Sequence, residues 1–321
     1  MMTKTQSIAL LLMASAMQCC TTAPTPYEEA IQHIVNLPAA PEGYKWVVNE
    51  DFTDEFNGTE LNTDLWHAKS PYWTNGRPPA TFKAESVSVK DGYLNITNYT
   101  LDSPEGNDGK PGDKYLYAGG AVASKSQDAF YGYYETRMKA SMTSMSSTFW
   151  LNNYGKIITE TTPDGVEAKI RVSQELDIIE TMGVITTLAK GDKSWNRNWN
   201  KQMNSNIHFW RRSSDIPTED IVGKRVDIES EEIEPSGEDF HTYGCWWIDA
   251  NTVKFYYDGK YMFTIKPSTK YTDEPMTTPM FMHLVTETYD WESGTTPEML
   301  ADKDAATTLY DWVRSYKLVE E

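Results

Sequence analysis

The stretch Gln174-Glu175-Leu176-Asp177-Ile178-Ile179-Glu180-Thr181 alternates acidic and apolar side chains over its first half. Because successive side chains of a β-strand point to opposite faces, we expect Glu175 and Asp177 on one face and the apolar residues beside them on the other. Strict alternation would turn Glu180 away from the two other acids. One extra residue, forming a β-bulge at Ile178-Ile179, would return Glu180 to their face. The stretch therefore predicts a bulged strand that presents three carboxylates on one side.

Three carboxylates so close together have two interpretations. Like charges raise the pKa of at least one acid, so one carboxyl can stay protonated while another is ionised. Glycoside hydrolysis needs such a pair, and retaining enzymes hold the two carboxyl groups roughly 5–5.5 Å apart. The alternative is the solvent-exposed face of an ordinary strand. The 11 Trp and 19 Tyr of the chain favour the first interpretation, because sugar rings stack on aromatic side chains.

Short β-rich segments separated by turns make up most of the chain from about Gly43 onward. Two hairpins are indicated, over residues 86–96 and 253–263, because Asp-Gly stands between two β-rich runs in each. Helical periodicity is confined to residues 27–37 and 297–300. The pattern predicts an all-β fold, a sandwich or barrel of one domain.

Composition narrows the class of protein further. The 321 residues are 39% hydrophobic, which is enough for a packed core and excludes global disorder. Lys and Arg number 29 against 47 Asp and Glu, giving a net charge of -18. Such an acidic chain is a poor partner for nucleic acid or anionic lipid. Three cysteines exclude a disulfide scaffold and a cysteine-built zinc cluster.

The N-terminus has the features of an export signal, predicted over residues 1–20. Its apolar run is too short to span a bilayer, which needs about 20 residues. Cys19 and Cys20 follow, and the segment resembles a bacterial lipoprotein signal in which one of these cysteines is acylated. A plain secretory signal is the alternative. We therefore expect a surface lipoprotein or a secreted or periplasmic protein, attached to membrane only through acyl chains, with a tether over 21–42 and a catalytic domain over 43–321.

The acidic stretch resembles the signature of glycoside hydrolase family 16 in its bulged form. Further segments resemble shared strands of that family, in the same order along the chain: residues 54–61 with Trp66, 131–139, 240–247, 255–259 and 310–316. The resemblance implies a β-jelly-roll of two curved antiparallel sheets, with a substrate cleft on the concave face.

The resemblance also implies a role for each acid. Glu175 would be the nucleophile that forms a glycosyl-enzyme, and Glu180 would be the acid that protonates the leaving oxygen and then the base that activates water. Asp177 would hydrogen-bond the nucleophile and tune its charge. The reaction would retain anomeric configuration in a monomer and need no cofactor. A structural calcium occurs in many relatives, but the sequence does not place its ligands.

Three segments resemble the agarases and porphyranases of this family: residues 73–79, 204–210 and 286–291. They suggest red-algal galactan cleaved at β-1,4 galactosidic bonds within the chain. We expect the following substrate-binding residues: Trp73, Arg77, Trp150, Arg171, Asn206, His208, Glu287 and Trp291. A histidine buried in the core is the alternative for His208, although its neighbours on the same strand face are polar.

Charge distribution bears on the choice between sulfated and neutral galactan. Residues 190–212 carry six Lys and Arg against one acid, whereas residues 215–239 carry ten acids against two basic residues. Lys169 and Arg171 share the strand face of Glu175, and a guanidinium matches the geometry of sulfate. We therefore favour porphyran over neutral agarose, with carrageenan and laminarin behind. A solvated basic face is the alternative for any one of these residues.

A protein of another class, a non-catalytic carbohydrate-binding lipoprotein, could use the same fold and aromatic platforms. Such a protein is expected to lose one of the two glutamates. Both Glu175 and Glu180 are present here, and this favours an enzyme.

Overall fold

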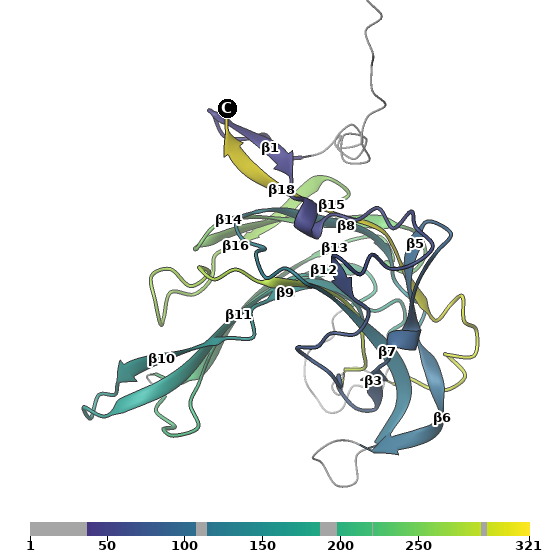
Figure 1. The fold of residues 1–321 in the computed structure, drawn as a ribbon, viewed down its shortest axis with the longest axis horizontal. Coiled ribbons are helices and arrows are strands. Elements are labelled where there is room, and N and C mark those ends of the chain that lie inside the picture. The colour runs from purple at the N-terminus through teal and green to yellow at the C-terminus, as the bar shows by residue number, and fades with distance from the viewer. Residues whose placement is uncertain (1–36, 107–113, 187–197, 220, 290–293) are drawn as a thin grey trace, which may run out of the picture.

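Two largely antiparallel β-sheets lie face to face in the computed structural model of the chain (Figure 1). The structure describes residues 37–106, 114–186, 198–219, 221–289 and 294–321. The prediction of a jelly-roll with two curved sheets is confirmed. No helix within these ranges is long and apolar enough to cross a membrane.

The outer sheet has eight strands in the order β16-β15-β14-β8-β18-β5-β4, with β1 on β18. Its strands are β1 (Tyr44–Val48), β4 (Val87–Lys90), β5 (Tyr93–Thr97), β8 (Gly132–Lys139), β14 (His241–Asp249), β15 (Thr252–Tyr257), β16 (Lys260–Ile265) and β18 (Thr307–Glu320). Short 3₁₀ helices, η1 (Glu50–Phe52) and η2 (Ala84–Ser86), lie between strands.

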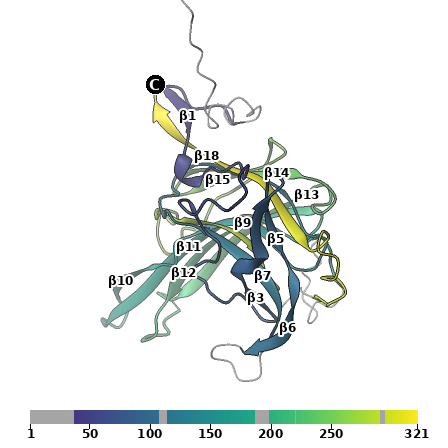
Figure 2. The same cartoon turned by 45° about the vertical axis from the view of Figure 1, so that its right-hand side comes forward.

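The inner sheet has ten strands in the order β13-β12-β11-β9-β17-β7-β2, with β10 on β11 and with β3 and β6 on β7. Its strands are β2 (Trp66–His67), β3 (Ala80–Phe82), β6 (Tyr99–Gly106), β7 (Lys114–Ser124), β9 (Ser147–Asn152), β10 (Lys156–Thr161), β11 (Glu167–Thr181), β12 (Gln202–Arg212), β13 (Gly223–Glu232) and β17 (Phe281–Thr286). The sheet arches between the β10 arm at one end and β6 with β7 at the other (Figure 1). β1 and the end of β18 project at the opposite end of the molecule from β3 and β6 (Figure 2).

Both predicted hairpins are present, as β4–β5 and β15–β16. Their turns place Asp91 at φ 56° and Asp258 at φ 46°, each followed by a glycine with positive φ, as two-residue hairpin turns require. The helix predicted over Pro297–Leu300 is wrong. That segment is a turn closed by a hydrogen bond from Leu300 N to Pro297 O, because four residues offer too few backbone bonds for a stable helix. Of the other helical candidate, residues 27–36 lie outside the described residues.

The core fills the space between the sheets and explains the register of β11. Leu176, Ile178 and Ile179 are all fully buried. Asp177 pairs with Asn206 of β12, but the next pair joins Glu180 to Asn204, so β11 contains one more residue than its partner between the two pairs. The same extra residue appears against β9. The predicted bulge is therefore present, and two adjacent isoleucines are accommodated without turning Glu180 into the core.

Candidate active site

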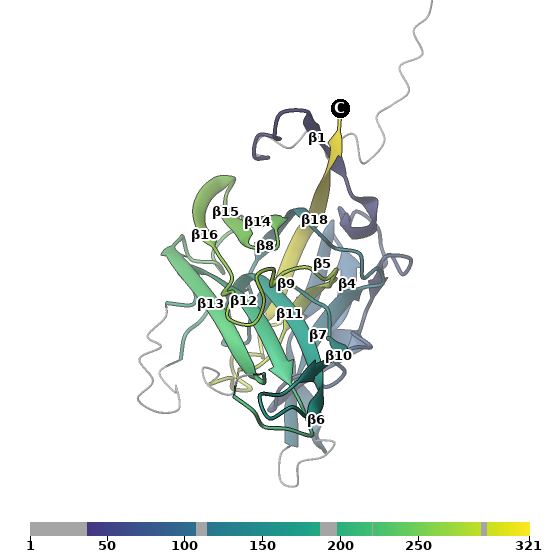
Figure 3. The same cartoon turned by 90° about the vertical axis from the view of Figure 1, so that its left-hand side faces the viewer.

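A cavity of about 420 Å³ lies on the concave face of the inner sheet. β11, β12 and β9 run side by side beneath it (Figure 3). Its lining consists of Trp73, Arg77, Thr148, Trp150, Asn152, Tyr154, Arg171, Ser173, Glu175, Asp177, Glu180, Trp210, Arg212, Glu287 and Tyr289. The three acids of β11 thus meet in one cavity, together with aromatic and basic side chains from several elements.

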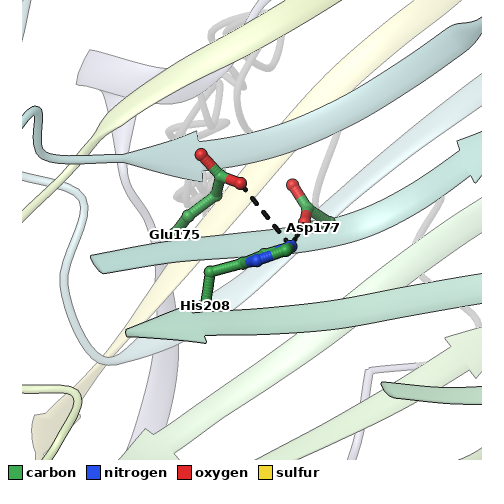
Figure 4. Close-up of side chains that lie close together, drawn as sticks. All are labelled: Glu175, Asp177 and His208. Carbon is green, nitrogen blue, oxygen red and sulfur yellow. Dashed lines mark ion pairs between the residues drawn. The ribbon is translucent and has the colours of Figure 1, made fainter. Parts of the chain in front are cut away.

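Glu175 and Asp177 each have a hydrogen-bonding partner on a neighbouring strand. Asn152 Nδ2 on β9 donates to Glu175 Oε2 at 2.7 Å. On β12, His208 Nε2 lies 3.1 Å from Asp177 Oδ2 and 3.6 Å from Glu175 Oε1, so its closer contact is with Asp177 (Figure 4). Strand pairing of Glu175 with His208 produces this arrangement. The two carboxyl groups are therefore held by side chains from both flanking strands.

Glu180 is held on both of its carboxyl oxygens. Asn206 Nδ2 donates to Oε2, and the Tyr289 hydroxyl donates to Oε1 at 2.8 Å. Asn206 comes from β12 and Tyr289 from the segment after β17. The residue beyond the bulge is thus fixed by one partner inside the sheet and one outside it.

Burial and nearby charges shift the pKa values of several groups in the site. Desolvation, with the nearby Glu180 charge, raises the pKa of Asp177 well above its usual value. Desolvation and the Asp177 charge raise the pKa of Glu175 to about 7. Burial lowers the pKa of His208, which favours the neutral imidazole. Three acids this close do not all ionise independently, and burial raises the pKa of both Glu175 and Asp177.

Arg77 and Glu287 form an ion pair at one end of the cavity, in which Glu287 is buried and the Arg77 side chain is 40% exposed. The Arg77 guanidinium also lies 5.2 Å from the centre of the Trp73 ring and 5.5 Å from that of Tyr289. Burial raises the pKa of Glu287 to about 8, although Arg77 opposes the shift. Trp73 meets Trp150 edge to face at 5.9 Å. This end of the cavity therefore combines aromatic side chains with the Arg77 cation, whose partner Glu287 has a raised pKa.

A second basic group lies around Trp210 at the other end of the cavity. The Arg212 guanidinium lies 4.4 Å from the centre of the Trp210 ring, and Lys224 Nζ lies 4.0 Å from it. Arg171 of β11 stands opposite Arg212 of β12 in the sheet. We call Arg171, Arg212, Lys224 and Trp210 the basic cluster. Because Trp210 supplies an apolar face among three cations, the cluster suits a sugar that carries an anion.

Several residues of the predicted basic stretch lie elsewhere. Arg211 is buried and paired with Glu160, so its charge is not available to the cavity. Lys169 shares the strand face of Arg171 but is exposed and does not line the cavity. Lys190, Lys193 and Arg197 lie outside the described residues, as the two N-terminal cysteines do.

Most of the predicted substrate-binding residues line the cavity: Trp73, Arg77, Trp150, Arg171 and Glu287. Asn206 and His208 do not line it, because their side chains lie beneath the acids and contact the carboxyl groups instead. Trp291 lies outside the described residues.

Sequence reasoning missed Asn152, Tyr289 and Lys224, and it included Arg212 only as one of the six basic residues of the stretch 190–212. Strand alternation could have found Asn152, two residues after Trp150, and Arg212, four residues after His208. Lys224 stands in the acid-rich stretch, and only the pairing of β13 with β12 places it opposite Trp210. Tyr289 follows the last residue of β17 by three positions, and no strand periodicity applies there.

Glu175, Asp177 and His208 are also the one group in the described ranges that brings three His, Cys, Asp or Glu ligand atoms within 4.8 Å of one another. Ca²⁺ takes six to eight oxygen ligands, and this group offers two carboxylates and an imidazole. These residues therefore do not fit a structural calcium site, and their hydrogen bonds suit them to proton chemistry.

An acid triplet on a bulged strand, at the bottom of an aromatic cleft in a jelly-roll, defines a glycoside hydrolase of the retaining type. The family model for the GH16 domain of β-porphyranases A–D matches residues 46–318. The chain therefore belongs to glycoside hydrolase family 16, as its sequence indicated.

Relatives of the chain carry the same identification. The chain is 65% identical over 294 residues to β-porphyranase B of Phocaeicola plebeius, and the alignment covers 91% of each chain. It is 50% identical to β-porphyranase E of Zobellia galactanivorans, with 87% of this chain and 90% of that one covered. A β-agarase of Phocaeicola plebeius is 28% identical, covering 90% of each. The crystal structure of β-porphyranase BpGH16B from Bacteroides plebeius matches with a TM-score of 0.84 at 62% identity, covering 92% of this chain and 99% of that one.

Proposed function

We propose that this enzyme cleaves β-1,4 galactosidic bonds within porphyran, a sulfated red-algal galactan. The observation that carries this proposal is the basic cluster, of which Arg171, Arg212 and Trp210 line the same cavity as the three acids. Identity of 65% to an enzyme named β-porphyranase supports it, against 28% to one named β-agarase. A cavity that served only neutral galactan would have no need of uncompensated cations beside Trp210.

The first chemical step is attack by Glu175 on the anomeric carbon. A carboxylate oxygen of Glu175 forms a bond to that carbon as the bond to the leaving oxygen breaks, and Glu180 gives its proton to the leaving oxygen. Asn152 holds Glu175 in place through its hydrogen bond to Glu175 Oε2. The product is a glycosyl-enzyme ester and a free chain end.

The second step releases the sugar. Glu180, now a carboxylate, takes a proton from water as the water oxygen attacks the anomeric carbon, and the ester bond to Glu175 breaks. Two inversions give net retention of configuration. Both steps use the chain's own residues, and the proton that Glu180 loses in the first is regained in the second.

The anionic group of the substrate is proposed to contact Arg171 and Arg212. Both guanidinium groups face the cavity, whereas Arg77 is already paired with Glu287. Paired guanidinium forks hold a sulfate with several charge-assisted hydrogen bonds. Arg77 then serves mainly to orient the sugar between Trp73 and Tyr289.

The test compares porphyran with chemically desulfated porphyran. Arg171→Gln is expected to reduce kcat/KM on porphyran by about 10-fold to 100-fold, the loss of one charge-assisted contact, and to change the desulfated reaction little. Lys169→Gln is the matched control, because it removes a cation from the same strand face outside the cavity. Equal losses on both substrates would contradict recognition of sulfate by Arg171.

Three further properties belong to this proposal. Export with acylation at Cys19 or Cys20 would place the enzyme where polysaccharide is found, and mass spectrometry of the mature N-terminus tests it. A calcium site would have to rest on other oxygens, and its loss in chelator would lower Tm. The enzyme is proposed to act as a monomer, which sedimentation tests.

A further inference from the structure

Tyr289 lines the cavity and combines a ring buried in the core with a hydrogen bond to a catalytic acid. Its side chain is 1% exposed and packs with Met182 and Trp199, whose ring centre lies 5.9 Å away. The hydroxyl reaches out of this packing to Glu180 Oε1 at 2.8 Å. A buried ring with so little freedom fixes the position of its hydroxyl.

The two partners of Glu180 differ in what they can do. Asn206 approaches through Nδ2, which can only donate a hydrogen bond. The hydroxyl of Tyr289 can donate to a carboxylate and, after rotating, accept from a carboxylic acid. Because Glu180 alternates between these two states in each turnover, Tyr289 is the partner that can follow both.

We propose that Tyr289 is a positioning residue for the acid/base Glu180, holding it in line with the leaving oxygen in both protonation states. The inference rests on the proposed role of Glu180. When Glu180 gives its proton to the leaving oxygen, the Tyr289 hydroxyl donates to the carboxylate that results. When Glu180 regains a proton from water, the hydroxyl can turn to accept. Tyr289 keeps its own proton throughout.

The bulge explains why Glu180 needs such a partner. Glu175 and Asp177 lie on regular strand with paired neighbours on both sides, whereas Glu180 follows the irregular step in register. A bulge bends its strand and re-aims the side chains next to it, so the backbone pairing of Glu180 with Asn204 and Thr148 does not by itself fix its carboxyl group. A second hydrogen bond from outside the sheet removes that freedom.

The test is the pH profile of kcat/KM for Tyr289→Phe. Without the Tyr289 hydroxyl, the carboxylate form of Glu180 loses a hydrogen-bond donor, so the protonated form is favoured. The basic limb of the profile reports the loss of the general acid's proton, and we expect this limb to move to higher pH by about one unit. The rate at the optimum is expected to fall about 10-fold to 100-fold. The control is Tyr134→Phe, which removes a buried hydroxyl bonded to Phe130 O in the outer sheet. It is expected to lower Tm without moving the pH profile.

A double variant separates positioning from simple support of the fold. If Tyr289 acts through Glu180, then Glu180→Gln with Tyr289→Phe is no slower than Glu180→Gln alone. Additive losses, or a Tyr289→Phe basic limb that coincides with that of the unmodified enzyme, would overturn the inference. Full turnover by Glu180→Gln alone would instead overturn the proposed mechanism, so the two failures are distinguishable.

Discussion

Two arginine–glutamate pairs of this molecule, Arg77–Glu287 and Arg314–Glu55, differ in which partner is buried and in how many oxygens of the glutamate are bonded. Each arginine stacks on a tryptophan, with Arg314 4.1 Å from the Trp312 ring centre. Arg314 donates to both oxygens of Glu55 at 2.8 Å. Arg77 bonds Oε1 of Glu287, and Oε2 is buried without a hydrogen-bond partner in the described part of the chain.

The difference separates a structural pair from one built for substrate. A bidentate pair satisfies its own charges, so Arg314–Glu55 stabilises the outer sheet. A pair with an unsatisfied oxygen leaves bonding capacity at the cavity, and burial there raises the pKa of Glu287 to about 8. Incomplete satisfaction of a buried carboxyl group therefore marks the functional end of the molecule.

The largest expected effect comes from Glu175→Gln. Losing the nucleophile is expected to reduce turnover of porphyran by at least about 10⁴-fold while oligosaccharide binding persists. Glu135→Gln is the matched control, since burial also raises the pKa of Glu135 to about 7 but its strand, β8, lies in the outer sheet. Initial rates and calorimetric binding measure both. Turnover by Glu175→Gln near the normal rate would refute the nucleophile assignment.

Substituting each of the two paired glutamates by glutamine should have opposite effects, one on activity and the other on stability. Glu287→Gln is expected to reduce kcat/KM by about 10-fold to 100-fold, because Arg77 loses its anchor, without lowering Tm. Glu55→Gln is expected to lower the free energy of unfolding by about 2 kcal/mol and leave kcat/KM unchanged. Denaturant titration and initial rates measure the two effects. If Glu55→Gln reduced activity and Glu287→Gln only stability, the comparison would be reversed.

The two pairs also differ in how pH acts on stability. Between the ordinary pKa of 4.5 and about 8, the folded chain retains the proton of Glu287 that the unfolded chain releases. The free energy of unfolding therefore falls as pH rises through this window, by at most about 1.4 kcal/mol per pH unit from this group. Unfolding measured from pH 5 to 8 should show a shallower decline in Glu287→Gln. Parallel curves for the two proteins would contradict the raised pKa.

The smallest effect is expected at a third ion pair, Arg137–Asp311. Arg137 Nη1 lies 2.6 Å from Asp311 Oδ2, and the arginine side chain is 36% exposed. Arg137→Gln should change the free energy of unfolding by no more than about 0.5 kcal/mol and leave kcat/KM unchanged. Thermal unfolding measures the first and initial rates the second. A loss as large as that of Glu55→Gln would show that the two hydrogen bonds of Arg314 to Glu55 stabilise the fold no more than the single contact of Arg137 with Asp311.

Sequence alone predicted those features that depend on neighbours along the chain. Strand alternation and two adjacent isoleucines predicted the bulge and the common face of Glu175, Asp177 and Glu180, and Asp-Gly turns predicted both hairpins. Periodicity over four residues was too short to predict a helix at Pro297–Leu300, and the structure has a turn there.

Contacts between distant segments could not be predicted in this way. The pairing of β12 with β13 places Lys224 at Trp210, and the path after β17 places Tyr289 at Glu180. Strand alternation could have separated Arg211 from Arg212, but the partner of Arg211, Glu160 on β10, is again a contact between distant segments. Which cations serve the cavity is therefore a property of tertiary structure and not of local charge density.

The most direct test of the account is the initial rate of reducing-end release from porphyran and from agarose by the chain without its first 20 residues. If the basic cluster binds the anionic group of the substrate, the rate on porphyran is expected to exceed the rate on agarose by at least about 10-fold. An equal or higher rate on agarose would contradict it and reduce the cluster to a solvated surface.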